Sequence, residues 1–405
     1  MNWSNENPRL LDKEIGYERE TGQYKIGDGI HNWNDLPYAN INLKELVGEK
    51  TKDGGEIFND YERNIASGIY SHAEGSGTVA EGIISHAEGY NTYAIGITSH
   101  AEGKATYALE ENAHAEGYNT CAQGYTSHAE GRATQAIGNQ SHVEGHESQA
   151  IGITSHAEGK ATYALDENAH AEGYNTYAQG YTSHAEGSGT VAEGIISHAE
   201  GRDTHAIGNQ SHVEGTGSNT TINGQHGHAE GYYSSVDALG AHAEGYRTVA
   251  SGKYAHAEGS GTKTQGYASH AEGYNTSALG ENAHAEGSYT NATGSTSHAE
   301  GESCLAAGKG SHAEGKATYA LSAYQHAQGK YNIGDSQNKY AHIVGNGTDG
   351  SNRSNAHTLD WDGNAWFAGN VTAGVNTTDN DDDLVLVTKG YLKQYVAEII
   401  ESLKS

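Results

Sequence analysis

Hydrophobic and polar positions alternate along most of this chain with a period of fourteen residues. The stretch SHAEGYNTYAIGIT, residues 85–98, shows the unit: two short segments of period-two alternation joined by links that contain glycine. Such alternation predicts β-strands, and fourteen residues are too few for two helices. Each repeat is therefore predicted to form one coil of a β-solenoid, stacked on its neighbours by parallel strand pairing.

A histidine opens each copy and sets the register of the array. These histidines fall at positions 72, 86, 100, 114, 128, 142, 156, 170, 184, 198, 212, 228, 242, 256, 270, 284, 298, 312 and 326. Two intervals, His212 to His228 and His326 to a degenerate copy at His342, are sixteen residues long and predict loop insertions. With the histidine as position 0, every residue of a coil is named below by its offset from that histidine.

Alternation assigns each position to the inside or the outside of the coil. Small residues recur at +1, +3, +6, +8, +10 and +13 and are predicted to fill a narrow lumen, the glycine at +3 included. His at 0 and Glu at +2 point outward yet repeat from coil to coil, whereas +7 and +9 vary. A constant outer face implies a constant neighbour, and further copies of the same chain are the simplest one.

We therefore predict a homotrimer that buries the His–Glu face. The predicted interface residues include His86, Glu88, His100, Glu102, His156, Glu158, His170, Glu172, His184 and Glu186. Pairing across this face predicts that the Glu pKa falls and the His pKa rises. Ions bound on the trimer axis are the alternative to pairing.

Eighteen His-x-Glu-Gly copies also raise the question of catalysis, because imidazole and carboxylate serve as acid–base groups. The copies recur without a distinctive neighbour and without a loop long enough for a substrate pocket. We predict that the chain is not an enzyme, with no catalytic residue, no metal ligand and no cofactor.

Composition narrows the partners. With 35% hydrophobic residues and 56 glycines the chain cannot fill a thick core, and a net charge of −29 without a basic stripe makes nucleic acid an unexpected partner. No run of about eighteen apolar residues occurs and the N-terminal residues lack a secretion signal, so membrane insertion is not expected. Cys121 and Cys304 stand at ordinary repeat positions and are predicted to be substitutions rather than a disulfide.

Outward tyrosines form the candidate receptor surface, because aromatic side chains of this kind bind glycans and proteins. Tyrosine also suits exposed β-structure, so the same residues fit a surface that binds nothing. The tyrosines concerned are Tyr90, Tyr93, Tyr107, Tyr118, Tyr163, Tyr174, Tyr177 and Tyr274.

Four regions are expected along the chain: a small β module at 1–50, the repeat β-roll at 51–345, a β-hairpin cap at 346–375, and a linker with a C-terminal helix at 376–405. The roll is expected to begin with a capping coil. Phe58 takes the histidine position one period before His72 in that coil, and Asn64, Ala66 and Gly68 take the Thr, Ala and Gly positions.

Turn and seam patterns define the C-terminal regions. Asp362-Gly363 predicts the hairpin turn, and Trp361, Trp366 and Phe367 are expected to form a compact apolar cap. The linker includes the stretch TTDNDDD. Apolar residues at four-three-four spacing near the C-terminus predict a helix with one apolar stripe, called the seam, formed by Leu392, Val396, Ile399 and Leu403. This seam would pack either in a three-stranded helical bundle or against the hairpin cap.

The unit SHAEGxxTxAxG resembles the head repeat of YadA-like trimeric autotransporter adhesins, with His and Glu where the S-V-A-I-G of that family has two apolar residues. The resemblance covers about residues 57–345. It implies an all-β, left-handed parallel β-roll in a trimer, with this strand at the subunit interface.

Both ends resemble phage proteins. EIGYERETGQYKIGDGIHNWNDLPY, residues 14–38, is similar to the N-terminal module of tail fibre proteins, and residues 354–374 are similar to the segment after such repeats in tail structural proteins. These resemblances imply a receptor-binding phage or prophage tail fibre in the virion, made in the host cytoplasm, that contacts other tail proteins and a host glycan or protein. A passive spacer rod and a bacterial surface adhesin are the alternatives.

Overall fold

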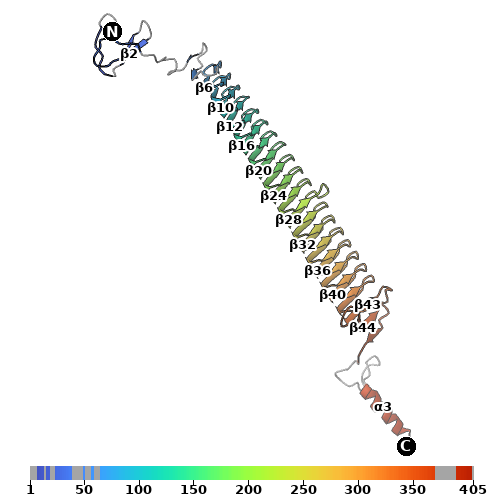
Figure 1. The fold of residues 1–405 in the computed structure, drawn as a ribbon. Coiled ribbons are helices and arrows are strands. Elements are labelled where there is room, and N and C mark those ends of the chain that lie inside the picture. The colour runs from blue at the N-terminus through green and yellow to red at the C-terminus, as the bar shows by residue number, and fades with distance from the viewer. Residues whose placement is uncertain are drawn as a thin grey trace. The chain divides into compact units, whose positions relative to one another are not determined.

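The structure, a computed structural model, describes residues 7–12, 15–18, 23–38, 49–50, 56–58, 64–369 and 389–403. The chain divides into two compact units, Met1–Asn168 and Ala169–Ser405, and each is considered by itself. Both units contain the predicted coil, so the all-β parallel solenoid of about 20 turns is confirmed (Figure 1).

Each coil of the first unit holds a five-residue strand and a two-residue strand. The longer strands are β6 (His72–Ser76), β8 (His86–Tyr90), β10 (His100–Lys104), β12 (His114–Tyr118), β14 (His128–Arg132), β16 (His142–His146) and β18 (His156–Lys160). The shorter strands are β5 (Ile65–Ala66), β7 (Val79–Ala80), β9 (Tyr93–Ala94), β11 (Tyr107–Ala108), β13 (Cys121–Ala122), β15 (Gln135–Ala136), β17 (Gln149–Ala150) and β19 (Tyr163–Ala164).

The second unit repeats this arrangement. Its longer strands are β20 (His170–Tyr174), β22 (His184–Ser188), β24 (His198–Arg202), β26 (His212–Thr216), β28 (His228–Tyr232), β30 (His242–Tyr246), β32 (His256–Ser260), β34 (His270–Tyr274), β36 (His284–Ser288), β38 (His298–Glu302), β40 (His312–Lys316) and β42 (His326–Lys330). The shorter strands are β21 (Tyr177–Ala178), β23 (Val191–Ala192), β25 (His205–Ala206), β27 (Asn219–Thr220), β29 (Ser235–Val236), β31 (Val249–Ala250), β33 (Lys263–Thr264), β35 (Ser277–Ala278), β37 (Asn291–Ala292), β39 (Leu305–Ala306) and β41 (Tyr319–Ala320).

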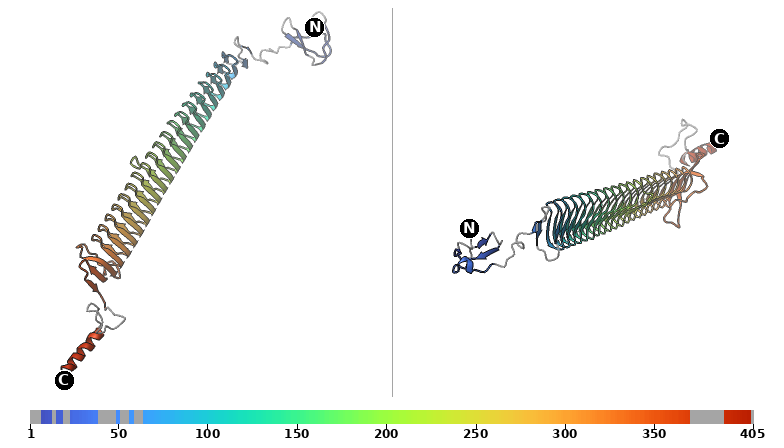
Figure 2. Two further views of the ribbon diagram at one scale, coloured as in Figure 1. Left: turned by 180° about the vertical axis from the view of Figure 1, so that it is seen from behind. Right: turned by 90° about the horizontal axis from the view of Figure 1, so that it is seen from above.

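Strands of one kind pair in parallel within each unit, with identical coil positions side by side (Figure 2). His100 pairs with His114 in the first unit, and His170 pairs with His184 in the second. Both insertions leave the register intact, since His212 pairs with His228, and the strand of His326 pairs in the same way with the next strand. The two longer intervals therefore are loop insertions, as predicted.

The lumen is filled by small side chains. Ala87, Ala94 and Thr92 are fully buried, and Ser85 behind them is almost so. In several coils the serine hydroxyl at +13 donates back to the carbonyl at +10, as from Ser85 to Gly82 at 2.7 Å, which satisfies a polar group inside the coil. The inward assignment of +1, +6, +8 and +13 is confirmed.

The glycine at +3 has another role than the predicted one. Gly89 is only half-buried, its φ is +122°, and a Cβ on it would lie 1.9 Å from the Gly103 carbonyl oxygen. Glycine is needed here because the backbone is left-handed and the next coil approaches it closely. Placing this residue among the lumen side chains was wrong.

The N-terminal residues form a small β element around buried Trp33. Strand β1 (Ile15–Glu18) pairs antiparallel with β2 (Gln23–Ile26), and a 3-10 turn, η1 (Trp33–Asp35), follows. Trp33 clusters with Leu10 and Leu36, and the Lys25 ammonium donates to the Trp33 carbonyl at 2.8 Å.

The capping coil begins in a different register from the predicted one. Strand β4 (Glu56–Phe58), preceded by β3 (Glu49–Lys50), pairs in parallel with β6 so that Glu56 stands beside His72. Phe58 therefore lies at the glutamate position and not the histidine position. The second strand keeps the expected register, with Ala66 beside Ala80. Asp60, which the expected register would place one period before Glu74, lies outside the described residues, as does the TTDNDDD stretch.

At the other end, β43 (Tyr340–Asn346), β44 (Asn355–Asp360) and β45 (Ala365–Phe367) form an antiparallel meander. The predicted turn is present at Asp362-Gly363, with Gly363 at φ +88°. Trp361, Trp366 and Phe367 are 49%, 55% and 48% exposed, so within this chain they do not form the compact cap that was expected.

Helix α3 (Lys389–Ser402) confirms the predicted C-terminal helix. Its described side chains, from residue 393 to 403, are all exposed, including Val396, Ile399 and Leu403 of the seam, while the side chain of Leu392 lies outside the described residues. Among the described helices, none has the length and apolarity to span a membrane. Cys121 and Cys304 are both free thiols.

Candidate functional site

The histidines at position 0 form a continuous stack of imidazole rings within each unit, called the His ladder below. Ring centroids of neighbouring coils lie 4.7 Å apart at His128 and His142 and 4.8 Å apart at His142 and His156, with interplanar angles of 6° and 2°. Parallel in-register strands repeat at about 4.8 Å, which places identical side chains face to face. The pair His228 and His242, at 63°, departs from this stacking.

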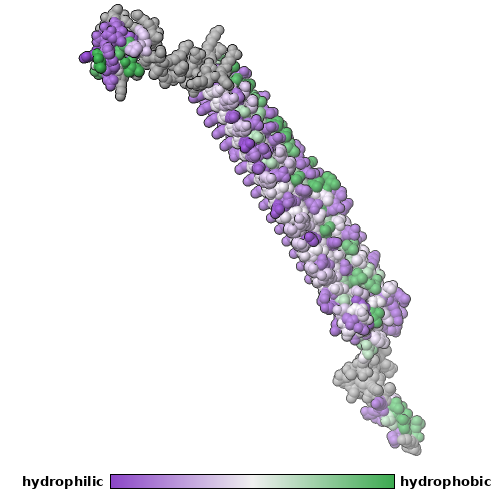
Figure 3. Space-filling model, viewed as in Figure 1, coloured by the Kyte–Doolittle hydropathy of each residue, from purple (hydrophilic) through white to green (hydrophobic). Residues whose placement is uncertain are grey.

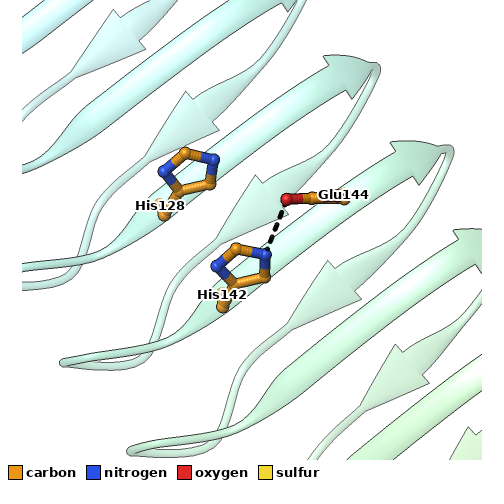
Figure 4. A group of neighbouring side chains, drawn as sticks. All are labelled: His128, His142 and Glu144. Carbon is orange, nitrogen blue, oxygen red and sulfur yellow. Dashed lines mark hydrogen bonds and ion pairs between the residues drawn. The ribbon is translucent and has the colours of Figure 1, made fainter.

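In most coils the glutamate at +2 turns back toward the histidine of its own coil, whereas Glu314 lies 3.4 Å from His326 of the next coil. The Nε2–Oε2 distance is 3.5 Å between His86 and Glu88, and the side chains of this pair are 35% and 47% exposed. His142 and Glu144 approach to 3.0 Å and form a hydrogen bond (Figure 4). The two positions together make a polar stripe that the single chain leaves half-covered.

The surroundings of the histidine Nε2 atoms indicate which ring nitrogen carries the hydrogen. The Nε2 atoms of His184, His198 and His298 are buried and make no hydrogen bond within the described part of the chain, although a carboxylate oxygen lies 3.5–3.6 Å from each. Buried polar atoms are nearly always paired. We therefore assign the Nε2–H tautomer, with the hydrogen directed at the glutamate of the same coil.

Several ladder histidines have a pKa below the ordinary value of an imidazole. Burial lowers the pKa of His100, and the neighbouring imidazoles of His114 and His86 lower it further, while Glu102 opposes these effects by less. The same direction and leading cause apply to the pKa of His128, His212, His242, His284, His298, His312 and His342. Within the single chain the pKa of these histidines therefore falls, whereas the rise expected from pairing across chains stays a prediction.

Four groups along the ladder bring two imidazoles and a carboxylate within 4.8 Å of one another. They are His128, His142 and Glu144; His284, Glu286 and His298; His298, Glu300 and His312; and His312, Glu314 and His326. A tetrahedral zinc ion needs lone pairs that converge at about 2.0–2.1 Å. Stacked rings, such as His298 and His312 at 3°, direct their lone pairs in parallel, so coordination would require them to rotate.

Every predicted interface residue lies on this polar stripe. His86, Glu88, His100, Glu102, His156 and Glu158 belong to the first unit; His170, Glu172, His184 and Glu186 belong to the second. Burial of the stripe by further chains stays a prediction, because one chain is described.

The predicted receptor tyrosines separate into groups. In the first unit Tyr93 and Tyr107 are half-buried and stack at 5.1 Å, whereas Tyr90 and Tyr118 are exposed two coils apart. Tyr163 lies farther along the same unit. Tyr174, Tyr177 and Tyr274 belong to the second unit, where Tyr274 meets Tyr289 edge to face at 5.2 Å.

The structure adds residues that the sequence reasoning missed. Lys104 and Arg132 lie in the same edge column as Tyr90 and Tyr118, at coil position +4, and their spacing of 28 residues was a readable signal. A second aromatic group, formed by Tyr232, Tyr233, Tyr246 and Arg247, lies in the second unit. On the side seen in Figure 3, exposed apolar side chains form separate patches.

A pocket of about 770 Å³ lies beside the C-terminal meander and is lined in part by Lys339, Tyr340 and Trp366. Asp335 on its wall accepts hydrogen bonds from the backbone amides of Lys339 and Tyr340, both at 2.8 Å. These bonds fix the loop between β42 and β43, so this carboxylate has a structural role.

Comparison with known proteins agrees with this geometry. The family described as YadA head domain repeat (2 copies) matches residues 87–106, 171–194 and 271–297. The chain is thus similar to YadA head repeats over these stretches, and its fold is that of parallel β-solenoid repeat proteins. No curated protein matches the chain.

Proposed function

We propose that this chain is one subunit of a trimeric adhesin-type fibre in which the His–Glu stripe faces two further copies of itself. The observation that supports this most is the stripe: a half-exposed, in-register ladder of His and Glu that repeats while the positions around it vary. Solvent-facing positions have no need of such repetition, whereas an axis shared by identical chains repeats the same contacts in every coil.

A polar interface of this kind is workable only if its carboxylates are paired. Burying an unpaired carboxylate costs several kcal/mol, and breaking a buried pair costs about 3–5 kcal/mol. In most coils the histidine Nε2 already lies 3.0–3.9 Å from a carboxylate oxygen of the glutamate in the same coil. Closing the stripe against neighbouring chains would exclude water and shorten these contacts.

Apolar surfaces at the C-terminus also favour association. Trp361, Trp366 and Phe367 are exposed on the meander, and Val396 and Ile399 are exposed on α3. A seam of two turns does not hold an isolated helix in place, whereas three such seams can pack together.

The proposed role is structural, without catalysis: a trimeric phage tail fibre in the virion that presents its variable face to the host surface. The support for the phage assignment is the resemblance of residues 14–38 and 354–374 to tail fibre segments. A bacterial surface adhesin would use the same repeats. Immunogold labelling of intact phage particles and of bacterial envelopes distinguishes the tail fibre from the adhesin. Label on the phage tail supports the tail fibre, and label only on bacterial envelopes overturns it.

Charge reversal on the stripe tests the trimer. Three copies of a 42.7 kDa chain give a mass of about 128 kDa. The triple variant Glu158→Lys, Glu172→Lys and Glu186→Lys places about nine cations on the axis and should lose that mass in light scattering.

The matched control makes the same change at three exposed glutamates away from the stripe: Glu110→Lys, Glu193→Lys and Glu281→Lys. This control should remain a trimer. Equal behaviour of the two variants would reject the interface, and a wild-type mass of one chain would reject the fibre.

A further inference from the structure

The coils of the first unit, residues 64–168, carry their basic side chains in one line. Residues 64–168 contain Lys104, Arg132 and Lys160 and no other Lys or Arg, against thirteen Asp and Glu. All three cations stand at coil position +4, one at every second coil. In a chain of net charge −29 such placement concentrates positive charge on a single edge.

Aromatic side chains alternate with the cations on this edge. Strand pairing places Lys104 between Tyr90 and Tyr118, and the ammonium lies 5.6 and 5.7 Å from the two ring centroids. The Arg132 guanidinium lies 5.8 Å from the Tyr118 ring. These contacts keep the cations extended over exposed rings, with successive cations two coils, or about 9.6 Å, apart.

The carboxylates of the coils that carry Lys104 and Arg132 are directed elsewhere, whereas His146, which stands between Arg132 and Lys160 in this column, has its Nε2 3.5 Å from Glu147 Oε1. Glu102 and Glu130 turn toward the His ladder, with their oxygens 3.5 and 3.6 Å from histidine Nε2 atoms, and in the part of the chain that the structure describes neither Lys104 nor Arg132 forms an ion pair. The stacked Tyr93 and Tyr107 belong to the second strands of adjacent coils and add further aromatic surface in the same stretch.

We propose that the edge formed by Tyr90, Lys104, Tyr118, Arg132 and Lys160 binds a linear acidic polysaccharide that carries one anionic group per disaccharide. Two coils span about the length of an extended disaccharide, so each carboxylate or sulfate meets one cation while the sugar rings between lie on the aromatic rings. The inference rests on the proposed function and gives the class of its host ligand.

Single-stranded nucleic acid fits this edge less well. It carries one charge per nucleotide, a denser pattern than one cation every second coil, and it would meet the strong negative field of the remaining surface. Nucleic acid binding is therefore an outcome that the test below must be able to detect.

Titration of the full-length fibre with defined oligomers tests the proposal. The probe is an octasaccharide of alternating glucuronate and N-acetylglucosamine; the comparators are a neutral N-acetylglucosamine oligomer and a thymidine octanucleotide. We expect binding of the acidic octasaccharide that weakens with salt and exceeds both comparators. No binding of this octasaccharide, or tighter binding of the octanucleotide, would overturn the proposal.

Paired variants locate the site. Lys104→Gln with Arg132→Gln should weaken octasaccharide binding at least about tenfold, and Tyr118→Ser should weaken it as well. The control Lys253→Gln with Lys263→Gln removes the same charge from exposed positions outside the column and should change affinity less than about twofold. Equal losses in the two double variants would overturn the assignment.

Failure here can be told apart from failure of the fibre itself. If the wild-type protein is a trimer and the Lys104→Gln, Arg132→Gln double variant binds host cells as well as the wild type does, this edge is rejected and the proposed fibre stands. A monomeric wild-type protein that binds no host cell would reject the proposed fibre.

Discussion

Gly187 offers a sharp test of how closely the coils stack. Its φ is +118°, and a Cβ built on it would lie 2.0 Å from the carbonyl oxygen and 2.9 Å from the carbonyl carbon of Gly201 in the next coil. The obstacle is backbone inside a parallel ladder, so it cannot swing aside as a side chain does. Gly187→Ala should therefore force the two coils apart.

The expected cost has two parts. Holding a residue with a Cβ at such a φ costs about 1–3 kcal/mol. Relieving the overlap by shifting packed backbone adds about 1–3 kcal/mol, as for overpacked cores. We expect Gly187→Ala to lower the free energy of unfolding by about 2–6 kcal/mol per chain, and to speed amide hydrogen exchange in β22 and β24 first.

Gly189, two residues later in the same turn, is the matched control. Its φ is +70°, and its Cβ would meet Asp203 Oδ1 at 2.6 Å, the end of a flexible side chain. Equivalent positions in other coils already hold Ala105 and Ala133 at φ 56°. Gly189→Ala should cost at most about 1 kcal/mol.

The assay is thermal unfolding by circular dichroism, with hydrogen exchange read by mass spectrometry. A melting curve of Gly187→Ala that matches wild type, or one no lower than that of Gly189→Ala, would refute the stacking argument.

Three further predictions follow from the same coil. Ala178→Leu should destabilise by about 1–3 kcal/mol because Ala178 is fully buried in the lumen, whereas Gln179→Leu on the exposed side should melt like wild type; equal melting of both would mean that the faces are misassigned. Burial and neighbouring imidazoles hold the pKa of His284, His298 and His312 below 6.5, so the folded chain takes up protons less readily than the unfolded chain. The contribution of these histidines to stability should therefore be fully present above about pH 6.5 and should be lost as the pH falls toward their lowered pKa values. A melting temperature that stays flat from pH 7.5 to 4.5 would contradict this. Ile399→Asp should weaken the trimer in light scattering at dilution because Ile399 lies on the exposed seam of α3, whereas Glu398→Lys should not, and the reverse order would place the seam on another face.

Much of the coil could be predicted from sequence because each side-chain position repeats many times. One repeat leaves open which of two alternating faces is buried, but the persistence of Ala at +1 and +8 against the variation at +7 decides it, and Ala87 and Ala94 are indeed fully buried. Ladder register followed from histidine spacing, including the insertion between His212 and His228.

Features without repetition, or set by backbone rather than side chain, were harder to predict. Phe58 lies in a single irregular coil, so no second copy revealed its shift to the glutamate position. The small size of Gly89 suggested the lumen, although its positive φ and the close carbonyl of Gly103 explain it.

The lowered histidine pKa within the single chain was also missed, for an electrostatic reason. The sequence showed a glutamate for eighteen of the nineteen ladder histidines, but it did not show that the imidazoles of neighbouring coils stack on one another. Those neighbours and burial together outweigh the carboxylate at His100. Lys104 and Arg132 were overlooked because three cations are few in total, although their alignment in one column carries the signal.

Imaging the fibre in cross-section by electron cryomicroscopy tests the central claim most directly. The account predicts three chains around a threefold axis, with the histidine and glutamate columns of each coil facing that axis and the tyrosines at +4 and +7 outside. A fibre one chain wide, or three chains that meet through the tyrosine columns, would contradict it.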